Sequence, residues 1–208
     1  MKLVILGANG RTGRHVVQEA RDRGANVTAV VRSDAKRPTV KHDQLQVAVG
    51  DPCDPEFLSK VFRDQDAVIS TLGGRTPTKK ATSIYWKSAD AIVEAAWDTG
   101  LQKIAVTSSA LLFPPQRLID RVLTILVHNI VQSATRMEQK LCNANLDVSV
   151  ARCGFLHDAE ETRYRAERGV LPKDGSSVSR IALARFLVDQ IHTPCSGCQV
   201  YGVSGPTA

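Results

Sequence analysis

Apolar runs rich in β-branched residues alternate with helical patterns along the whole chain. The runs are continuous rather than apolar at every second position, which is typical of strands buried on both faces of a parallel sheet. This order of strands and helices predicts an α/β fold with a doubly wound parallel sheet. The expected strands are residues 2–6, 26–32, 45–50, 66–72, 103–109, 146–152 and 199–203. The expected helices are residues 11–24, 54–63, 80–99, 116–144 and 178–191.

Local signals mark the ends of three of these helices. Asp54 followed by Pro55 is a typical helix start, because the carboxylate can cap free N–H groups and proline suits the first turn. Gly24 and Gly100 follow two other helical patterns and are typical helix stops, since glycine readily adopts the left-handed conformation.

Three glycines interrupt the chain between the first strand and the first helix, in the sequence GANGRTG. Gly7 permits a tight turn, Gly10 lets the backbone approach a ligand, and Gly13 lets the helix pack close to the sheet. The N–H groups at the start of that helix attract an anion, which indicates a pyrophosphate site. A glycine-rich turn without a ligand is the alternative. The residues expected to hold the pyrophosphate are Gly7, Asn9, Gly10, Arg11, Thr12 and Gly13.

The end of the second strand indicates which dinucleotide would bind. An acidic residue there would favour NAD, but this chain has Arg32 and Ser33, with Arg11 in the glycine turn. A cationic fork suits a 2′-phosphate, so NADPH is the expected cofactor, with a solvated surface arginine as the alternative. Asp51 is expected beside the adenine. Leu72 and Gly73 are expected on the ribose side of the same site.

Composition limits the other classes of protein. The chain has 208 residues, which suits one domain over 1–208, with substrate-side loops at 73–80, 110–117 and 154–177. Its net charge of +6 fits a phosphate-bearing small molecule better than nucleic acid, because aromatic residues are few and no nucleic-acid motif is present. No apolar run would span a bilayer and no signal peptide is recognisable, so we expect a cytoplasmic protein without membrane contact.

The five cysteines do not indicate a disulfide framework. Cys53, Cys142 and Cys153 fall at element ends or in a strand, where cysteine behaves as a small apolar residue. Cys195 and Cys198 form CSGC, which we interpret as a turn before the last strand. A redox pair or a weak metal site is the alternative, but no second pair completes a zinc site, and we expect no metal.

Six segments together carry a family resemblance. The chain resembles the atypical short-chain dehydrogenase/reductases with an NAD(P)-binding Rossmann fold, especially the NmrA-like group and the biliverdin-IX-beta (flavin) reductases. The segments are GANGRTG at 7–13, VGD at 49–51, STLGG at 70–74, VTSSALL at 106–112, LDVSVARCGFL at 146–156 and VSRIALARFLVDQI at 178–191.

The resemblance implies a reductase that binds NADPH, with Ser108 beside the nicotinamide. The Tyr-x-x-x-Lys pair of ordinary short-chain dehydrogenases is absent, and the histidine of biliverdin-type relatives corresponds to about Gly154 here. His157 lies nearby as a candidate substitute. We therefore predict hydride transfer to a planar conjugated acceptor, such as a flavin, a quinone or a tetrapyrrole. The alternative is a non-enzymatic NADPH sensor of the NmrA-like kind.

Overall fold

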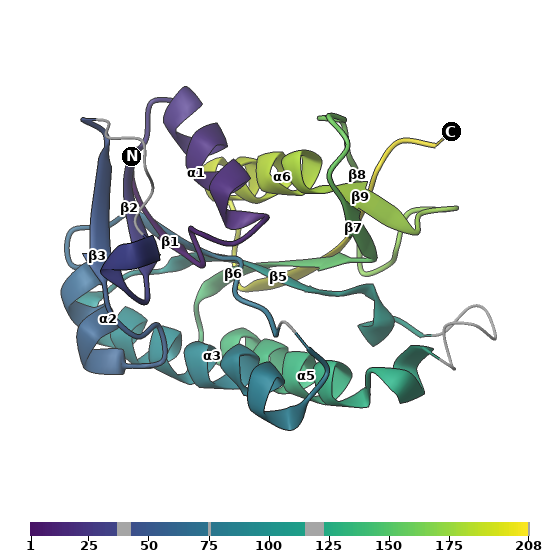
Figure 1. Cartoon of the computed structure of the whole chain (residues 1–208), viewed down its shortest axis with the longest axis horizontal. Helices are drawn as coiled ribbons and strands as arrows, with labels where there is room; N and C mark the ends of the chain where they lie inside the picture. The colour runs from purple at the N-terminus through teal and green to yellow at the C-terminus, as the bar shows by residue number, and fades with distance from the viewer. Residues whose placement is uncertain (37–42, 75, 115–122, 208) are drawn as a thin grey trace.

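The apolar runs form the strands of a central sheet in the computed structural model, which describes residues 1–36, 43–74, 76–114 and 123–207 (Figure 1). The strands are β1 (Lys2–Leu6), β2 (Asn26–Val31), β3 (Leu45–Val49), β4 (Ala67–Ser70), β5 (Lys103–Ser109), β6 (Asp147–Cys153), β7 (Phe155–His157), β8 (Arg165–Arg168), β9 (Ser177–Ser179) and β10 (Cys198–Ser204). Within the described ranges, eight of them form one sheet in the order β3-β2-β1-β4-β5-β6-β10-β8, and β7 pairs with β9 separately.

The sheet is parallel from β3 to β10, and β8 is added antiparallel at the edge beside β10. This arrangement confirms the doubly wound α/β fold. The chain leaves β1 toward β2 and β3 on one side, and later returns to β4, β5 and β6 on the other. The carboxyl end of β1 is therefore the point where the strand order reverses, which is where such sheets bind ligands.

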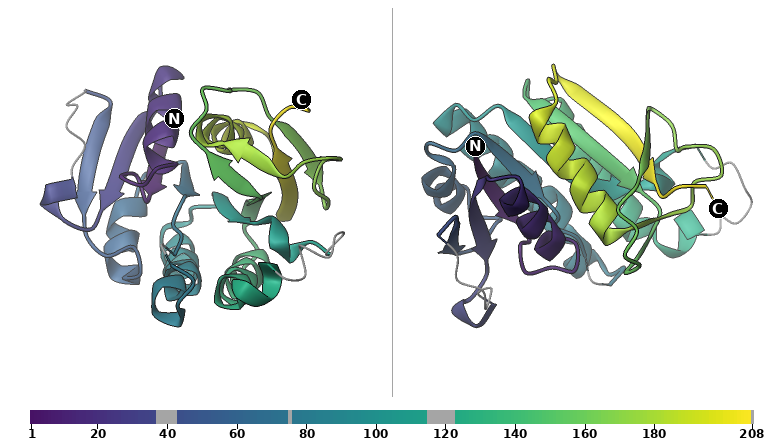
Figure 2. Two further views of the ribbon diagram at one scale, coloured as in Figure 1. Left: turned by 45° about the vertical axis from the view of Figure 1, so that its right-hand side comes forward. Right: turned by 90° about the horizontal axis from the view of Figure 1, so that it is seen from above.

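Helices cover both faces of the sheet (Figures 1 and 2). The α-helices are α1 (Gly13–Asp22), α2 (Pro55–Phe62), α3 (Lys79–Thr99), α5 (His128–Cys142) and α6 (Arg180–His192). One apolar core lies between the sheet and α1 with α6, and a second lies between the sheet and α2, α3 and α5. None of the helices in the described part of the chain has the length and apolarity needed to cross a membrane.

The predicted helix signals are confirmed. Asp54 caps α2 by accepting hydrogen bonds from the N–H groups of Glu56 and Phe57, at 3.0 and 3.3 Å, and Pro55 opens the helix. Gly24 follows α1 with a φ of 77°, and Gly100 ends α3 with a φ of 75°. Both glycines adopt the left-handed conformation that ordinary side chains avoid.

Two expected segments differ from the structure. The second half of the helix expected over 116–144 is α5, which begins at His128. Residues 116–122 of that expected helix lie outside the described residues. The expected loop at 154–177 contains β7, β8 and the start of β9. Each of these strands has only three or four residues, which is too short to show a strand pattern in the sequence. β8 forms because β10 offers it a partner, and β7 and β9 pair with each other.

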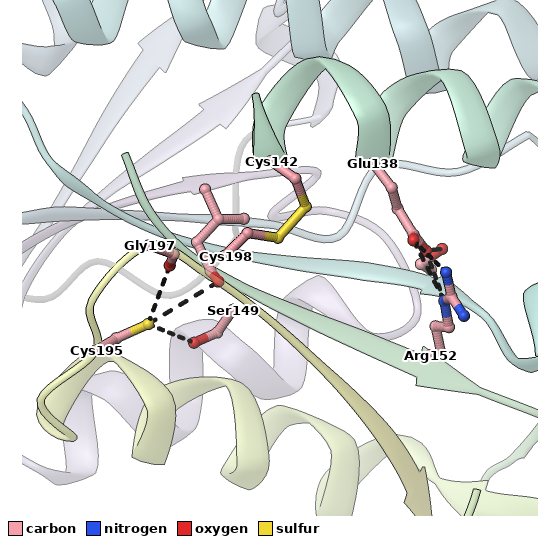
Figure 3. Close-up of a disulfide and its surroundings, with 9 residues drawn as sticks. Glu138, Cys142, Ser149, Arg152, Cys195, Gly197 and Cys198 are labelled. Carbon is pink, nitrogen blue, oxygen red and sulfur yellow. Dashed lines mark hydrogen bonds and ion pairs between the residues drawn. A yellow bond between two sulfur atoms is a disulfide. The ribbon is translucent and has the colours of Figure 1, made fainter. Parts of the chain in front are cut away.

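The interpretation of Cys142 as a small apolar residue is wrong, because Cys142 forms a disulfide with Cys198 (Figure 3). The bond joins the end of α5 to the start of β10. Residues 195–197 of the CSGC segment lie before β10, with a bend at Gly197, and Cys198 is the first residue of that strand. Cys195 and Cys198 do not pair with each other. Cys195 is a free cysteine, and Ser149 donates a hydrogen bond to its Sγ at 3.9 Å (Figure 3).

Candidate functional site

The glycine turn packs as closely as its sequence predicts. The N–H of Gly10 donates to the carbonyl of Gly7 at 2.8 Å, which closes the turn after β1. A Cβ on Gly13 would lie 2.1 Å from the Gly7 carbonyl oxygen, so only glycine lets α1 begin this close to the strand. Thr12 is buried at the N-cap, but its side chain accepts no capping hydrogen bond. No side chain therefore caps the start of α1, although the N–H groups of Arg14 and His15 donate to the carbonyls of Gly10 and Thr12, at 3.1 and 3.0 Å. An uncapped helix start favours an anion.

A cleft of about 670 Å³ opens along this turn at the carboxyl ends of β1 to β4, and we call it the glycine-loop cleft. It brings together seven residues that the sequence predicted for the cofactor: Gly7, Asn9, Gly10, Arg32, Asp51, Leu72 and Gly73. The other predicted residues, Arg11, Thr12, Gly13, Ser33 and Ser108, do not line the cleft.

Two lysines of α3 complete the cationic side of the cleft. Lys80 and Lys87 line it together with Arg32, and Ile84 lies between them on the same helix face. The spacing of four and three residues was present in the sequence, but α3 was not assigned to this site. Lys87 and Arg32 also lie close enough to Cys53 to influence its thiol. Three cationic side chains thus line one cleft, and such side chains are suited to binding phosphate.

A carboxylate and a thiol also line the same cleft, at Asp51 and Cys53. Asp51 accepts a hydrogen bond from the N–H of Cys53 at 3.0 Å, which fixes the carboxylate at the end of β3. Burial, assisted by that carboxylate, raises the pKa of the Cys53 thiol to about 11. Cys53 is therefore neutral at physiological pH.

Ser108 belongs to a buried polar network that sequence reasoning missed. Its hydroxyl donates to Oε1 of Glu138 on α5 at 2.5 Å. Arg152 on β6 pairs with the same carboxylate, with Nη2 2.7 Å from Oε2 and Nε 3.1 Å from Oε1 (Figure 3). Arg152 also donates to the carbonyl of Leu112 at 3.1 Å and lies over the ring of Phe113, 4.7 Å from its centroid.

This network fixes the direction in which the Ser108 hydroxyl donates its hydrogen bond. An ionised carboxylate only accepts hydrogen bonds, so the hydroxyl proton points at Glu138. The oxygen of Ser108 then offers lone pairs to a ligand rather than a proton. The sequence did contain a signal for this network, because each of two apolar segments includes one charged residue. Arg152 lies near the end of the apolar strand β6, and Glu138 lies on the apolar face of α5. Buried charges require a partner.

His157 and Arg11 take positions that the sequence did not predict. His157 is exposed at the end of β7 and lines neither the glycine-loop cleft nor the cavity described below, so its catalytic role stays a prediction. Arg11 pairs with the exposed carboxylate of Asp158, which also accepts from the nearly buried Arg180 at 2.7 Å. These hydrogen bonds, first that from Arg11, lower the pKa of Asp158.

A second hollow of about 310 Å³ lies at the carboxyl ends of β5 and β6, and we call it the β5–β6 cavity. Ser109 and Gly154 line its strand side, and side chains of the segment after β5, of α5 and of the loop before β9 form its walls. Both hollows lie at the carboxyl ends of strands of the same sheet, and the neighbouring strands β4 and β5 border the cleft and the cavity, respectively. Ser108 lies on β5 next to the cavity residue Ser109, and it lines neither hollow.

A family model described as NAD(P)H-binding matches residues 7–194 of the chain. A photosystem II assembly factor, Ycf39, from Synechocystis is 28% identical over 160 residues, which cover 75% of this chain and 45% of that protein. An uncharacterised protein of Bacillus subtilis, YwnB, is 33% identical over 73 residues, covering 35% of this chain and 32% of that protein. The chain spans about half the length of the assembly factors that it matches.

Solved structures share the fold at low sequence identity. A short-chain dehydrogenase/reductase from Veillonella parvula in complex with NADP has a TM-score of 0.79 at 20% identity, covering 97% of this chain and 94% of that one. An anaerobillin reductase from Escherichia coli O157:H7 has a TM-score of 0.79 at 20% identity, covering 100% and 98%. At 20% identity these matches show the fold alone, and they confirm the α/β fold that the sequence predicted. The family model confirms the predicted NAD(P)-binding family.

Proposed function

Because the chain belongs to the NAD(P)H-binding family, we propose that it is an NADPH-dependent oxidoreductase that passes hydride to a planar conjugated acceptor. The observation that carries the proposal is the convergence of Arg32, Lys80 and Lys87 in the glycine-loop cleft, beside a separate apolar cavity. Three cations around one cleft favour a 2′-phosphate, which NADPH has and NADH lacks. The apolar cavity provides a separate binding site for the acceptor.

The glycine turn fits the pyrophosphate of a dinucleotide. Its backbone lies so close to the start of α1 that a Cβ on Gly13 would overlap the Gly7 carbonyl, and the first N–H groups of the helix are not capped by a side chain. Asn9, Gly10 and Thr12 belong to the same cradle. We also assign Arg11 to a phosphate of the cofactor. Arg11 would leave its exposed partner Asp158 to bind the phosphate, and Asp158 would keep its ion pair with Arg180.

The remaining residues would orient the two ends of the cofactor. Asp51 accepts from the adenine amino group, Ser33 assists Arg32 at the 2′-phosphate, and Leu72 with Gly73 borders the ribose. Ser108 accepts a hydrogen bond from the nicotinamide carboxamide, because its own proton is held by Glu138. The bound dihydronicotinamide supplies hydride. The accompanying proton comes from water, since Ser108 has no free proton to give.

A non-enzymatic NADPH sensor is the second candidate. The observation that favours it is the same hydroxyl, which donates to Glu138 and leaves the site without an assigned proton donor. The similarity to an assembly factor points in the same direction, because that relative is named for assembling a complex. The two candidates differ in turnover, whereas both require NADPH to bind.

The test is NADPH oxidation by the purified protein with FMN, riboflavin, biliverdin and neutral quinones, each with NADH in parallel. Biliverdin is included because a structural neighbour is an anaerobillin reductase. The proposal predicts turnover of at least one acceptor with NADPH. The same turnover should fall in Arg32→Ala but not in the control Arg168→Ala, which removes an exposed arginine on β8. Tight NADPH binding without turnover of any acceptor would favour the sensor.

A further inference from the structure

The side chain of Tyr85 reaches from α3 to the loop that follows β4. It is half-buried and packs against the apolar core between the sheet and α2, α3 and α5. A Cβ on Gly73 would lie 3.1 Å from the Tyr85 hydroxyl oxygen and 3.6 Å from the ring carbon that carries it. The phenol hydroxyl therefore lies directly beside the backbone of Gly73, a residue that lines the glycine-loop cleft.

The loop after β4 lies beside the last residues of β5. The two strands are parallel neighbours, and their pairing ends with Ser70 opposite Val106. Continuing this register by two residues brings Leu72 level with Ser108, the residue that we assign to the nicotinamide. Gly73 is the next residue of the loop, so the phenol beside it lies near the end of β5.

The thiol of Cys153 relates the same phenol to the β5–β6 cavity. Cys153 lines that cavity, and its Sγ donates to the carbonyl of Ser108 at 3.4 Å. The thiol also lies close enough to Tyr85 to influence the pKa of the phenol. The Tyr85 hydroxyl lines neither hollow itself, but it has one neighbour in each lining, Gly73 in the cleft and Cys153 in the cavity.

The surroundings of Tyr85 keep its phenol protonated at physiological pH. Burial is the largest cause that raises its pKa above the ordinary value of 10.0, and the thiol of Cys153 raises it further. A hydrogen bond from the backbone of Gly74 lowers the same pKa, because it stabilises the phenolate. That hydrogen bond would likewise stabilise the phenolate that remains after the phenol has given its proton away.

The other two tyrosines of the chain use their protons elsewhere. Tyr164 donates to Asp189 on α6, and Tyr201 donates to Gln199 on β10. Both pack against the core on the α1 and α6 side of the sheet, the face opposite to α3. Among the three tyrosines, all of which lie in the described ranges, Tyr85 is the one beside the glycine-loop cleft.

We propose that Tyr85 is the proton donor of the reduction, a catalytic residue that gives its hydroxyl proton to the acceptor as the acceptor takes hydride. The inference rests on the proposed NADPH-dependent reduction and adds the proton donor that this function leaves unassigned. A quinone acceptor takes hydride from NADPH and the proton from Tyr85, and the products are hydroquinone, NADP⁺ and the Tyr85 phenolate. Water then returns a proton to the phenolate, so water remains the net source of the proton.

The test compares two acceptors that differ in their need for a proton. Menadione needs a hydride and a proton, whereas methylene blue is a cation that becomes neutral by taking a hydride alone. Tyr85→Phe keeps the ring and removes the hydroxyl. We expect kcat with menadione to fall at least about tenfold, a smaller loss than a general acid usually causes because water can substitute. The kcat with methylene blue and the affinity for NADPH should stay unchanged.

Tyr201→Phe is the matched control, because it removes a hydroxyl whose proton is donated to Gln199 on β10. It should leave kcat with both acceptors unchanged. A structural role of Tyr85 would instead lower kcat with both acceptors alike in Tyr85→Phe. Such an equal loss, or an unchanged kcat with menadione in Tyr85→Phe, would overturn the proposal.

The same measurements separate this inference from the proposed function. If the unmodified protein reduces menadione and Tyr85→Phe reduces it equally well, the reductase assignment stands and Tyr85 is not the proton donor. If the unmodified protein binds NADPH but reduces neither menadione nor methylene blue, nor any other acceptor of the panel, the reductase assignment fails and the role of Tyr85 fails with it.

Discussion

Glu138 should be among the residues whose removal destabilises the protein most. Its side chain is 7% exposed, and the guanidinium of Arg152 that pairs with it is on a side chain only 18% exposed. The pair is joined by contacts of 2.7 to 3.2 Å, and Ser108 donates to the same carboxylate. Glu138→Ala would leave one partly buried charge and one buried hydroxyl without their acceptor.

The magnitude follows from the cost of breaking a buried ion pair, which is about 3–5 kcal/mol when one partner is removed. Arg152 keeps some contact with water and its hydrogen bond to Leu112, so the lower end of that range applies, about 3 kcal/mol. Glu138→Gln keeps the side-chain volume and one acceptor oxygen, and it should lower the free energy of unfolding by about 1–2 kcal/mol.

The assay is urea unfolding followed by circular dichroism, with Glu94→Ala on the exposed face of α3 as the control. The control should change the free energy of unfolding by less than about 0.5 kcal/mol. The double variant Glu138→Ala/Arg152→Met should be more stable than Glu138→Ala alone, because it removes the stranded charge. A loss below about 1 kcal/mol in Glu138→Ala, with no recovery in the double variant, would refute the reasoning.

Three further predictions concern the glycine turn and the cysteines. Gly13→Ala should lower the free energy of unfolding by about 1–3 kcal/mol and weaken NADPH binding, because its Cβ would lie 2.1 Å from the Gly7 oxygen. Gly205→Ala, whose Cβ would meet only an ordinary contact, is the control in the same unfolding and binding assays. Alkylation of Cys53, followed by peptide mass spectrometry, should stay slow until the pH approaches about 11 and should be blocked by NADPH, since burial raises its pKa from 9.0. The folded state holds that proton more tightly than the unfolded chain, so the contribution of this thiol to stability is full below pH 9.0 and is lost as the pH rises through about 11. Reducing the disulfide between α5 and β10 should lower the free energy of unfolding by about 2–4 kcal/mol, and Cys195→Ser should leave it unchanged.

The fold was largely predictable because its signals are local. The start of α2 at Pro55 depends on its own capping residue, Asp54, and the stops at Gly24 and Gly100 depend on glycine's left-handed conformation. The continuous apolar runs likewise identify buried parallel strands. The strands β7, β8 and β9 were missed because each has only three or four residues, and distant segments determine their pairing.

The lining of the glycine-loop cleft was more predictable than its surroundings. Residues of the glycine turn and of the strand ends follow from the order of strand, turn and helix. The disulfide could not be predicted, because the pairing of five cysteines depends on which elements meet in space. The partnership of Glu138 with Arg152 joins a helix to a strand, so the sequence shows two buried charges but not that they pair.

The most direct test of the account is the affinity of the protein for NADPH and for NADH, measured by calorimetry in the same buffer. The cationic cleft predicts that NADPH binds at least about tenfold more tightly, and that Lys87→Ala reduces this difference without weakening NADH. Equal affinities for the two cofactors, or a preference for NADH, would contradict the assignment of Arg32, Lys80 and Lys87 to a 2′-phosphate.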